Sequence, residues 1–193
     1  EVMIDRTIET DVLIIGGGGG GLRAAVEAHE AGARVLVLSK GIVGKSGLTQ
    51  TAVTGFQVAF GYADPRDNAD VHYADTIRGG YGLADPELAR IFTAGAVEAV
   101  EDIESFGARF DREPDGKLGQ RKLDSSQTYP RSIKKGDSLG TPIMQALRRQ
   151  INKRKIPRMH EILVTSLLKD GDRVCGAIAV DFQTGELLEI RAG

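Results

Sequence analysis

A run of six consecutive glycines, residues 16–21, constrains this chain more than any other feature. A short apolar segment, residues 11–15, precedes the glycines, and a helix-forming segment, residues 22–31, follows them. Residues 34–38 form a second apolar segment. Short apolar runs of this kind are typical of strands buried on both faces of a parallel sheet. The order strand, glycine turn, helix, strand predicts a dinucleotide-binding unit.

Within the glycine run, Gly16, Gly18 and Gly21 form the pattern G-x-G-x-x-G. In such a pattern Gly16 makes the tight turn, Gly18 lets the backbone approach a pyrophosphate, and Gly21 lets the helix pack closely on the strands. The N-terminus of the helix adds unpaired N–H groups and the positive end of its dipole. A glycine-rich loop without a ligand is the alternative for the pattern alone, and the flanking strands and helix favour the nucleotide site.

The charge balance and the cysteine count exclude several classes of function. The 193 residues include 25 Lys and Arg against 27 Asp and Glu, so bulk charge does not favour binding of nucleic acid. The single cysteine, Cys175, excludes an internal disulfide, and the three isolated histidines predict no metal site. No apolar run approaches the roughly 20 residues that span a bilayer, and the first residues lack the pattern of a signal peptide. We therefore expect a cytoplasmic chain that does not itself insert into a membrane.

The residues at the end of the second apolar segment depart from the general pattern. An NAD-binding unit carries an Asp or Glu about 20 positions after its glycines, where the acid binds the ribose. This chain has Ser39 followed by Lys40 instead. The departure counts against a plain NAD-binding domain.

Residues 11–61 resemble the flavoproteins of the succinate dehydrogenase and fumarate reductase family, of which L-aspartate oxidase is a relative. The resemblance rests on the glycine run, the pair Ser39-Lys40, the segment 44–47 and the glycine-rich segment 55–59. Looser landmarks continue toward the end of the chain, among them residues 75–76 and 140–142.

The resemblance implies an α/β fold for residues 1–193: a single FAD-binding domain of the dinucleotide-binding (Rossmann-like) type, with a parallel sheet, a β-meander and inserted helices. It also implies FAD as the cofactor. Members that attach FAD covalently use a histidine just after a Lys/Arg-Ser pair, whereas Gly47 and Leu48 stand there in this chain, so we expect non-covalent FAD. The implied cofactor-binding residues are Gly16, Gly18, Gly19, Gly20, Gly21, Ser39, Lys40, Lys45, Ser46, Gly47, Thr49, Thr54, Gly55 and Val164.

The remaining sequence predicts three helices and three strands. The helices are expected at residues 68–78, 86–106 and 142–153, the strands at 162–168, 174–182 and 187–191, and an irregular surface excursion at 111–135. In the second helix, apolar side chains recur every three or four positions, which predicts one face packed on the core. These side chains are Leu88, Ile91, Phe92, Val97, Val100 and Ile103.

A basic cluster lies at the end of the helix expected at residues 142–153. It consists of Arg148, Arg149, Lys153, Arg154, Lys155 and Arg158. Such a cluster is either a patch that binds phosphate or nucleic acid, or a solvated face whose charges suit a helix C-terminus. The sequence alone favours the solvated face.

For function, the resemblance implies an oxidoreductase that transfers hydride between flavin and a small dicarboxylate of the succinate or fumarate type. The family binds its dicarboxylate with residues of a capping domain and later segments, so no catalytic residue is assigned in this chain. The implied partners are the dicarboxylate, in the full-length protein, and an iron–sulfur electron-transfer subunit that would hold the protein at the cytoplasmic side of a membrane. The alternative is a nucleotide-binding or assembly module without redox activity of its own.

The chain is also expected to be an N-terminal fragment that is incomplete at its C-terminus, because it stops before the strand that normally completes the sheet in the family. Such a fragment is expected to be inactive alone. An open sheet edge also favours self-association, because its backbone N–H and C=O groups are unpaired.

Overall fold

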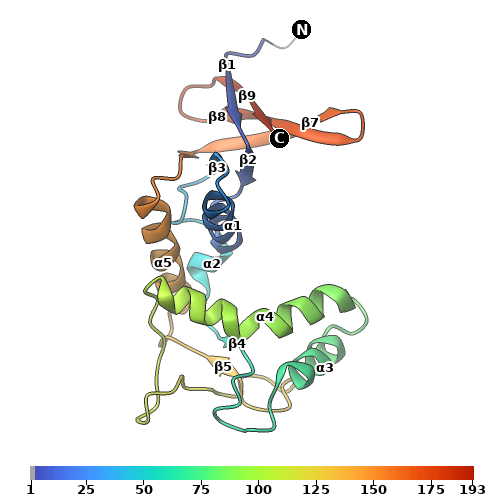
Figure 1. Cartoon of the computed structure of the whole chain (residues 1–193), viewed down its shortest axis with the longest axis vertical. Coiled ribbons are helices and arrows are strands. Elements are labelled where there is room, and N and C mark those ends of the chain that lie inside the picture. The colour runs from blue at the N-terminus through green and yellow to red at the C-terminus, as the bar shows by residue number, and fades with distance from the viewer. Residues whose placement is uncertain (1–2) are drawn as a thin grey trace. The chain divides into compact units, whose positions relative to one another are not determined.

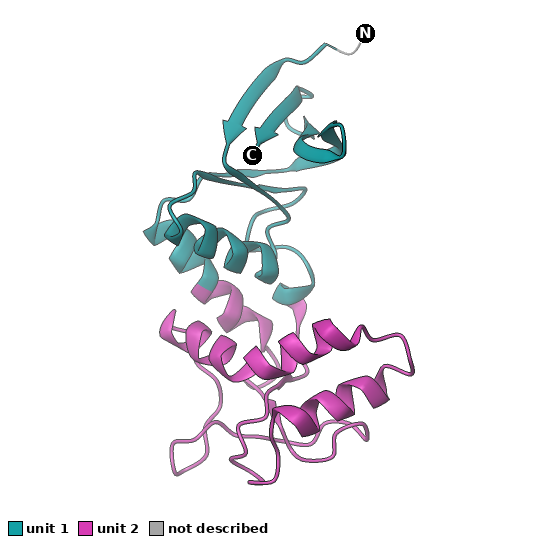
Figure 2. Ribbon diagram, turned by 45° about the vertical axis from the view of Figure 1, so that its right-hand side comes forward, with its two compact units in different colours: residues 1–50, 147–193 teal, residues 51–146 magenta. Residues whose placement is uncertain are grey.

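The structure is a computed structural model that describes residues 3–193 (Figure 1). The chain divides into two compact units, which Figure 2 shows in different colours. Unit 1 contains the chain up to residue 50 together with residues 147–193, and unit 2 contains residues 51–146. The predicted α/β class, with a parallel sheet, a meander and inserted helices, is confirmed.

Unit 1 is built around a three-stranded parallel sheet with the order β2-β3-β6. Its elements are β2 (Val12–Ile15), α1 (Gly19–Glu30), β3 (Val35–Ser39) and β6 (Arg158–His160). All of β3 is buried, and α1 turns Leu22, Ala25 and Val26 fully inward. The predicted order of strand, glycine turn, helix and strand is confirmed, although α1 begins inside the glycine run and not after it.

The prediction that the first strand is buried on both faces is wrong. The residues of β2 are only partly buried, and the side chain of Ile15 is 51% exposed. The reason is the strand order: β3 lies between β2 and β6, whereas β2 is the end strand of this sheet within the described residues. An apolar run therefore marked both strands, but only β3 has a neighbour on each side.

Unit 1 also holds a four-stranded sheet with the order β1-β9-β8-β7 (Figure 1). Its strands are β1 (Arg6–Thr10), β7 (Ile162–Asp170), β8 (Arg173–Asp181) and β9 (Leu187–Ala192). The last three form the predicted antiparallel meander. Sequence reasoning missed β1, which pairs in parallel with β9 and places Ile8 opposite Ile190.

Unit 2 contains two helices that pack on each other and a short antiparallel strand pair. These elements are α3 (Ala69–Gly79), α4 (Pro86–Ser105), β4 (Phe56–Gln57) and β5 (Ser132–Ile133). The side chains of Asn68 and Asp85 cap α3 and α4, each accepting hydrogen bonds from two backbone N–H groups. Two further helices, α2 (Leu48–Thr51) and α5 (Gly140–Lys153), cross the unit boundaries in the sequence. The three predicted helices are confirmed.

The apolar face predicted for α4 is only partly correct. Leu88 is 64% exposed, Ile91 63% and Phe92 49%, whereas Val100 is fully buried as predicted. The first half of α4 instead buries small side chains, those of Ala89, Thr93 and Ala96. Close packing thus selected the small residues, and the large apolar residues beside them face outward.

The prediction of an irregular surface excursion over residues 111–135 is only partly correct, because the segment is irregular and mostly exposed but part of it is buried. Arg131, Ser132 and Ile133 are fully buried, and Gln120 and Gln127 are almost fully buried. These polar groups are buried because they find partners. Gln120 Nε2 donates to the backbone oxygen of Val58 at 2.7 Å, and Gln127 Nε2 donates to Ser132 Oγ at 2.6 Å.

Arg131 is the centre of a buried ionic cluster in unit 2. Its Nη2 atom donates to Asp67 Oδ1 at 2.8 Å and to Asp75 Oδ2 at 2.7 Å. Asp75 also accepts from the backbone N–H of Thr128 at 2.7 Å. Burial raises the pKa of Asp67, and burial together with the Arg131 charge lowers the pKa of the buried His72 to about 4. The cluster joins α3 to the segments before and after it.

Arg131→Met is expected to lower the free energy of unfolding by about 3–5 kcal/mol, because it leaves the buried carboxylate of Asp67 without a cation and that of Asp75 with Arg78 alone. The measurement is urea unfolding of the whole protein. Arg66→Met is the matched control: Arg66 pairs with Asp64 at 2.6 Å, but its side chain is 72% exposed. Its loss should cost at most about 1 kcal/mol. Equal effects of the two variants would contradict the assigned importance of the buried cluster.

Folding stability is expected to fall between pH 6.5 and pH 4 because of His72. The unfolded chain binds a proton at this side chain near its usual pKa of 6.5, whereas the folded chain binds it only near 4. The stabilisation is therefore present above pH 6.5 and is lost, by up to about 3 kcal/mol, as the pH falls through this window. Urea unfolding at several pH values should show a steeper loss for the wild type than for His72→Gln, and parallel curves would refute the assignment.

Candidate functional site

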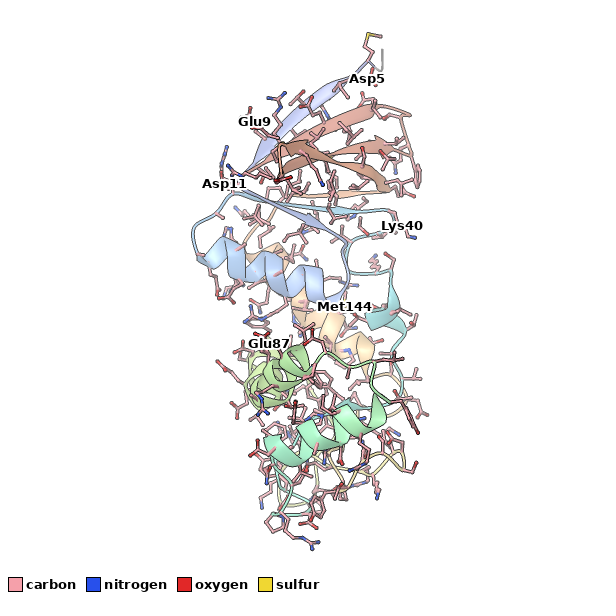
Figure 3. All side chains as sticks on the ribbon, turned by 90° about the vertical axis from the view of Figure 1, so that its right-hand side faces the viewer. Asp5, Glu9, Asp11, Lys40, Glu87 and Met144 are labelled. Atoms are coloured by element: carbon pink, nitrogen blue, oxygen red, sulfur yellow. The ribbon has the colours of Figure 1, made fainter. Side chains whose placement is uncertain are left out.

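A cavity of about 530 Å³ in unit 1 opens where β2 and β3 end. Four segments line it: residues 15–18, 38–41, 46–47 and 162–164. Figure 3 shows Lys40 at the carboxyl end of β3, while Asp11 lies at the opposite end of the sheet, before β2. Ligands of open α/β sheets bind at the carboxyl ends of the strands. We name this space the glycine-turn cavity.

The glycine turn is held by contacts that only glycine permits. Gly16 has a φ of +118°, and its N–H donates to the backbone oxygen of Leu38 at 2.8 Å. A Cβ atom on Gly21 would lie 1.9 Å from the backbone oxygen of Gly16. Since no side chain tolerates that distance, Gly21 allows α1 to start directly beside the turn, as predicted from the pattern.

The start of α1 has no cap from its own N-cap residue. Gly18 is the N-cap residue and its conformation is extended, so nothing covers the helix end from the N-cap position. The N–H of Gly19 donates to Thr49 Oγ1 at 3.2 Å. The first N–H groups of a helix have no acceptor within the helix and lie at its positive end. This end of α1 is therefore suited to an anionic group.

The absence of a side chain has a different reason at Gly17 than at Gly18. A Cβ atom on Gly17 would lie 2.9 Å from Val43 Cα, so the fold itself demands glycine there. A Cβ atom on Gly18 would meet only Thr49 Oγ1, at 4.0 Å. The protein leaves this space open, which fits a glycine kept free for the approach of a ligand. Sequence reasoning did not single out Gly17.

Ser39 and Lys40 stand where an acid is usual. Ser39 is buried, and its Oγ accepts a hydrogen bond from the N–H of Gly41 at 3.4 Å. Lys40 is exposed (Figure 3) and, among the described residues, is the only charged one that lines the glycine-turn cavity. No carboxylate of residues 3–193 lines the cavity, so no lining side chain repels an anion.

The structure brings about half of the residues assigned to the cofactor to this cavity. Those that line it are Gly16, Gly18, Ser39, Lys40, Ser46, Gly47 and Val164. Gly19, Gly20 and Gly21 form the first turn of α1, and Thr49 hydrogen-bonds to it. Lys45 is not among the lining residues and borders a different pocket of unit 1. Thr54 and Gly55 belong to unit 2, where Gly55 packs against Leu123 and Ser132.

Sequence reasoning missed Gly41, Ile162 and Leu163, which also line the cavity. Position was the available signal for Gly41, because it directly follows Ser39-Lys40. The two residues of β7 lie far from the turn in the sequence, and only the fold brings them to it.

Within residues 3–193, no group of three or more His, Cys, Asp and Glu side chains is placed to hold a metal ion. Nor does this part of the chain contain a helix that is both long enough and apolar enough to cross a bilayer.

Comparison with known proteins agrees with the geometry. Residues 11–193 match the family described as FAD binding domain. The chain is 42% identical over 190 residues to one subunit of the fumarate reductase (CoM/CoB) of Methanothermobacter marburgensis, an alignment that covers 98% of this chain and 35% of that protein. It is 33% identical over 170 residues to L-aspartate oxidase of Mycobacterium bovis, with 88% and 32% covered.

A solved structure also resembles this chain over nearly its whole length. Mycobacterium smegmatis Sdh1 in complex with UQ1 superposes on this chain with a TM-score of 0.91 and 35% sequence identity, covering 97% of this chain and 33% of that one. The chain therefore spans about a third of the length of the relatives it matches.

Gly18→Val is expected to lower FAD affinity at least about tenfold, because the new side chain fills the space kept open before α1 and blocks the pyrophosphate. The fold should persist, since no protein atom lies closer than 4.0 Å to the added Cβ. FAD titration and urea unfolding of the whole protein measure the two effects.

Gly95→Ala in α4 is the matched control, because a Cβ there meets nothing within 4 Å. It should leave FAD binding unchanged and stabilise the protein by about 0.5–1 kcal/mol. Unchanged FAD affinity in Gly18→Val would show that the cavity at the glycine turn is not the flavin site.

Proposed function

Because this chain belongs to the FAD binding domain family, among the succinate dehydrogenase and fumarate reductase flavoproteins, we propose that it binds FAD in the glycine-turn cavity and serves hydride transfer between flavin and a small dicarboxylate. One observation supports this site above the others: the glycine turn, the ends of β2 and β3 and the start of β7 open onto one cavity that no acidic residue of the described chain lines. The dicarboxylate follows from the names of relatives, which are fumarate reductases.

The lining residues fit a dinucleotide. The open space at Gly18 admits the pyrophosphate, and the uncapped start of α1 offers N–H groups and a positive dipole end to its charge. Ser39 and Lys40 offer a hydroxyl group and an ammonium group near the end of β3. Residues 162–164 of β7 border the same cavity, where backbone groups near Val164 would contact the adenine.

The roles of the chain are binding and orientation. When bound, the flavin supplies the capacity to accept or donate hydride, and the residues of this chain hold it in position. Within residues 3–193 we assign no side chain to the dicarboxylate or to proton transfer. The histidines illustrate why: His72 is buried in unit 2, and Nδ1 of His160 accepts a hydrogen bond from the N–H of Val43 at 3.0 Å. We propose that segments represented in the other two thirds of the relatives supply those groups.

We further propose that the FAD is held without a covalent bond. The segment 41–61 contains no histidine, and Gly47 and Leu48 follow the Lys45-Ser46 pair. The imidazole of His160, which contacts this loop at Val43, lines a pocket that shares no lining residue with the glycine-turn cavity.

The function is tested by dye-linked succinate oxidation and viologen-linked fumarate reduction with the full-length, FAD-loaded protein. We expect turnover in at least one direction, and loss of that turnover together with loss of FAD in Gly18→Val. The isolated 193-residue chain should show none with excess FAD, since we place the dicarboxylate site outside it. Full turnover by the isolated chain would overturn that placement, and a flavin-loaded full-length protein inactive on both compounds would overturn the dicarboxylate class.

Acid precipitation of the flavin-loaded protein is expected to release all of the flavin into the supernatant, because no imidazole of the described chain is placed to bond it. Flavin fluorescence in the supernatant and in a denaturing gel measures the partition. A protein with covalent FAD, treated in parallel, is the control for retention. Fluorescence that stays with the denatured polypeptide of this protein would disprove non-covalent attachment.

A further inference from the structure

A second pocket of unit 1 is cationic and separate from the glycine-turn cavity. It has a volume of about 280 Å³ and shares no lining residue with that cavity. Its polar lining comes from three parts of the chain: Lys45 in the loop after β3, Arg148 and Asn152 on α5, and Arg158 and His160 on β6. No acidic side chain of the described residues lines it. We name it the basic pocket.

The three cations of the basic pocket have no anionic partner. Within residues 3–193, Lys45, Arg148 and Arg158 form no ion pair and no side-chain hydrogen bond. Another arginine of the same basic cluster, Arg154 on the segment after α5, does pair, with Glu30 of α1. Like charges that line one pocket repel each other, and an anion between them would remove this repulsion.

Several contacts hold these groups in place. The aliphatic part of Arg148 packs over Gly44, where an added Cβ would lie 2.4 Å from Arg148 Cγ. The φ of Gly44 is +76°, and the N–H of Gly44 donates to the backbone oxygen of Gly17 at 2.9 Å. The N–H of Lys45 donates to the backbone oxygen of Ile42, so a turn fixes the backbone of the lysine.

His160 adds a donor to the pocket. Its Nδ1 atom accepts the hydrogen bond from the N–H of Val43, so Nδ1 carries no proton there. In the neutral imidazole the proton is then on Nε2, which makes Nε2 a hydrogen-bond donor. With Asn152, the basic pocket thus combines three positive charges and two neutral side chains able to donate.

The basic cluster at the end of α5 is interpreted either as an anion-binding patch or as a solvated face, and its members divide between the two. Lys153, Lys155 and Arg158 are all exposed, but Lys153 and Lys155 do not line the pocket. Arg148 and Arg158 instead meet Lys45, a residue distant in sequence, around one concave space. Charges on a solvated face do not need to line a common pocket, so this arrangement favours the anion-binding interpretation for Arg148 and Arg158.

We propose that the basic pocket binds a small anion of the phosphate class, either free inorganic phosphate or the phosphate group of a small monoester. Phosphate matches the lining because it carries nearly two negative charges and several acceptor oxygens, and guanidinium groups bind it through paired hydrogen bonds. A volume of 280 Å³ accommodates a small molecule. The basic pocket is distinct from the glycine-turn cavity, because the two have different linings.

The test is calorimetric titration of the full-length, FAD-loaded protein with inorganic phosphate and, separately, with glycerol phosphate, at constant ionic strength set with chloride. We expect saturable binding of one equivalent by the wild type. Arg158→Gln should weaken it at least about tenfold, because it removes a charged hydrogen-bond donor. The same variant should keep its full FAD content, which distinguishes failure of this site from failure of the flavin site.

Lys153→Gln is the matched control, since it removes one positive charge from the same helix as Arg148 but outside the pocket. It should bind phosphate as the wild type does. Tighter binding of either ligand supports the proposal and identifies the source of the phosphate group. The proposal is overturned by absence of saturable binding, by equal weakening in Arg158→Gln and Lys153→Gln, or by release of FAD from Lys45→Gln without any change in phosphate binding.

Discussion

The approach of Gly21 to the backbone oxygen of Gly16 is the constraint on which the rest of unit 1 depends. A Cβ atom at Gly21 would stand 1.9 Å from that oxygen, so the helix can begin where it does only because the side chain is absent. The position of α1 determines how its buried face meets β2 and β3, and it directs the helix N-terminus toward the ends of those strands. One steric condition thus controls both the packing of the sheet and the electrostatics of the cavity.

Local patterns were sufficient for the elements whose partners lie nearby in the sequence. The βαβ unit, the meander and the capped helices α3 and α4 follow from glycine positions, alternation and capping residues within short windows. Patterns failed where a distant partner decides the outcome. Arg131 is expected to be a solvated cation until Asp67 and Asp75 are brought beside it, and the strand β1 cannot be predicted before β9 is in place. The burial expected for Leu88 and Ile91 failed for a related reason, because amphipathic spacing does not say which of two adjacent stripes is packed.

The candidate site shows the same division. The residues of the glycine run and the pair Ser39-Lys40 could be assigned from the chain alone, because turn geometry and strand ends are local. The pair Lys45-Ser46 could not. Adjacent residues of a loop face different directions, and here Ser46 borders the glycine-turn cavity while Lys45 borders the basic pocket. A resemblance that assigns both residues to the cofactor cannot separate them, since their separation depends on the turn between Ile42 and Lys45.

The pairing of β1 with β9 has a consequence for how the protein is made. Residues 6–10 must wait for residues 188–192 before they can form their ladder, whereas unit 2 is continuous in the sequence from 51 to 146. During synthesis, all of unit 2 is translated before β7, β8 and β9, and domains generally fold as units from the N-terminal side. Unit 2 can therefore begin to assemble its core while β1 is still unpaired, because β9 follows unit 2 in the sequence. Closing the long loop between β1 and β9 is then an entropically costly step that must wait for β9, and until it is complete the unpaired edge of β1 is open to misassembly.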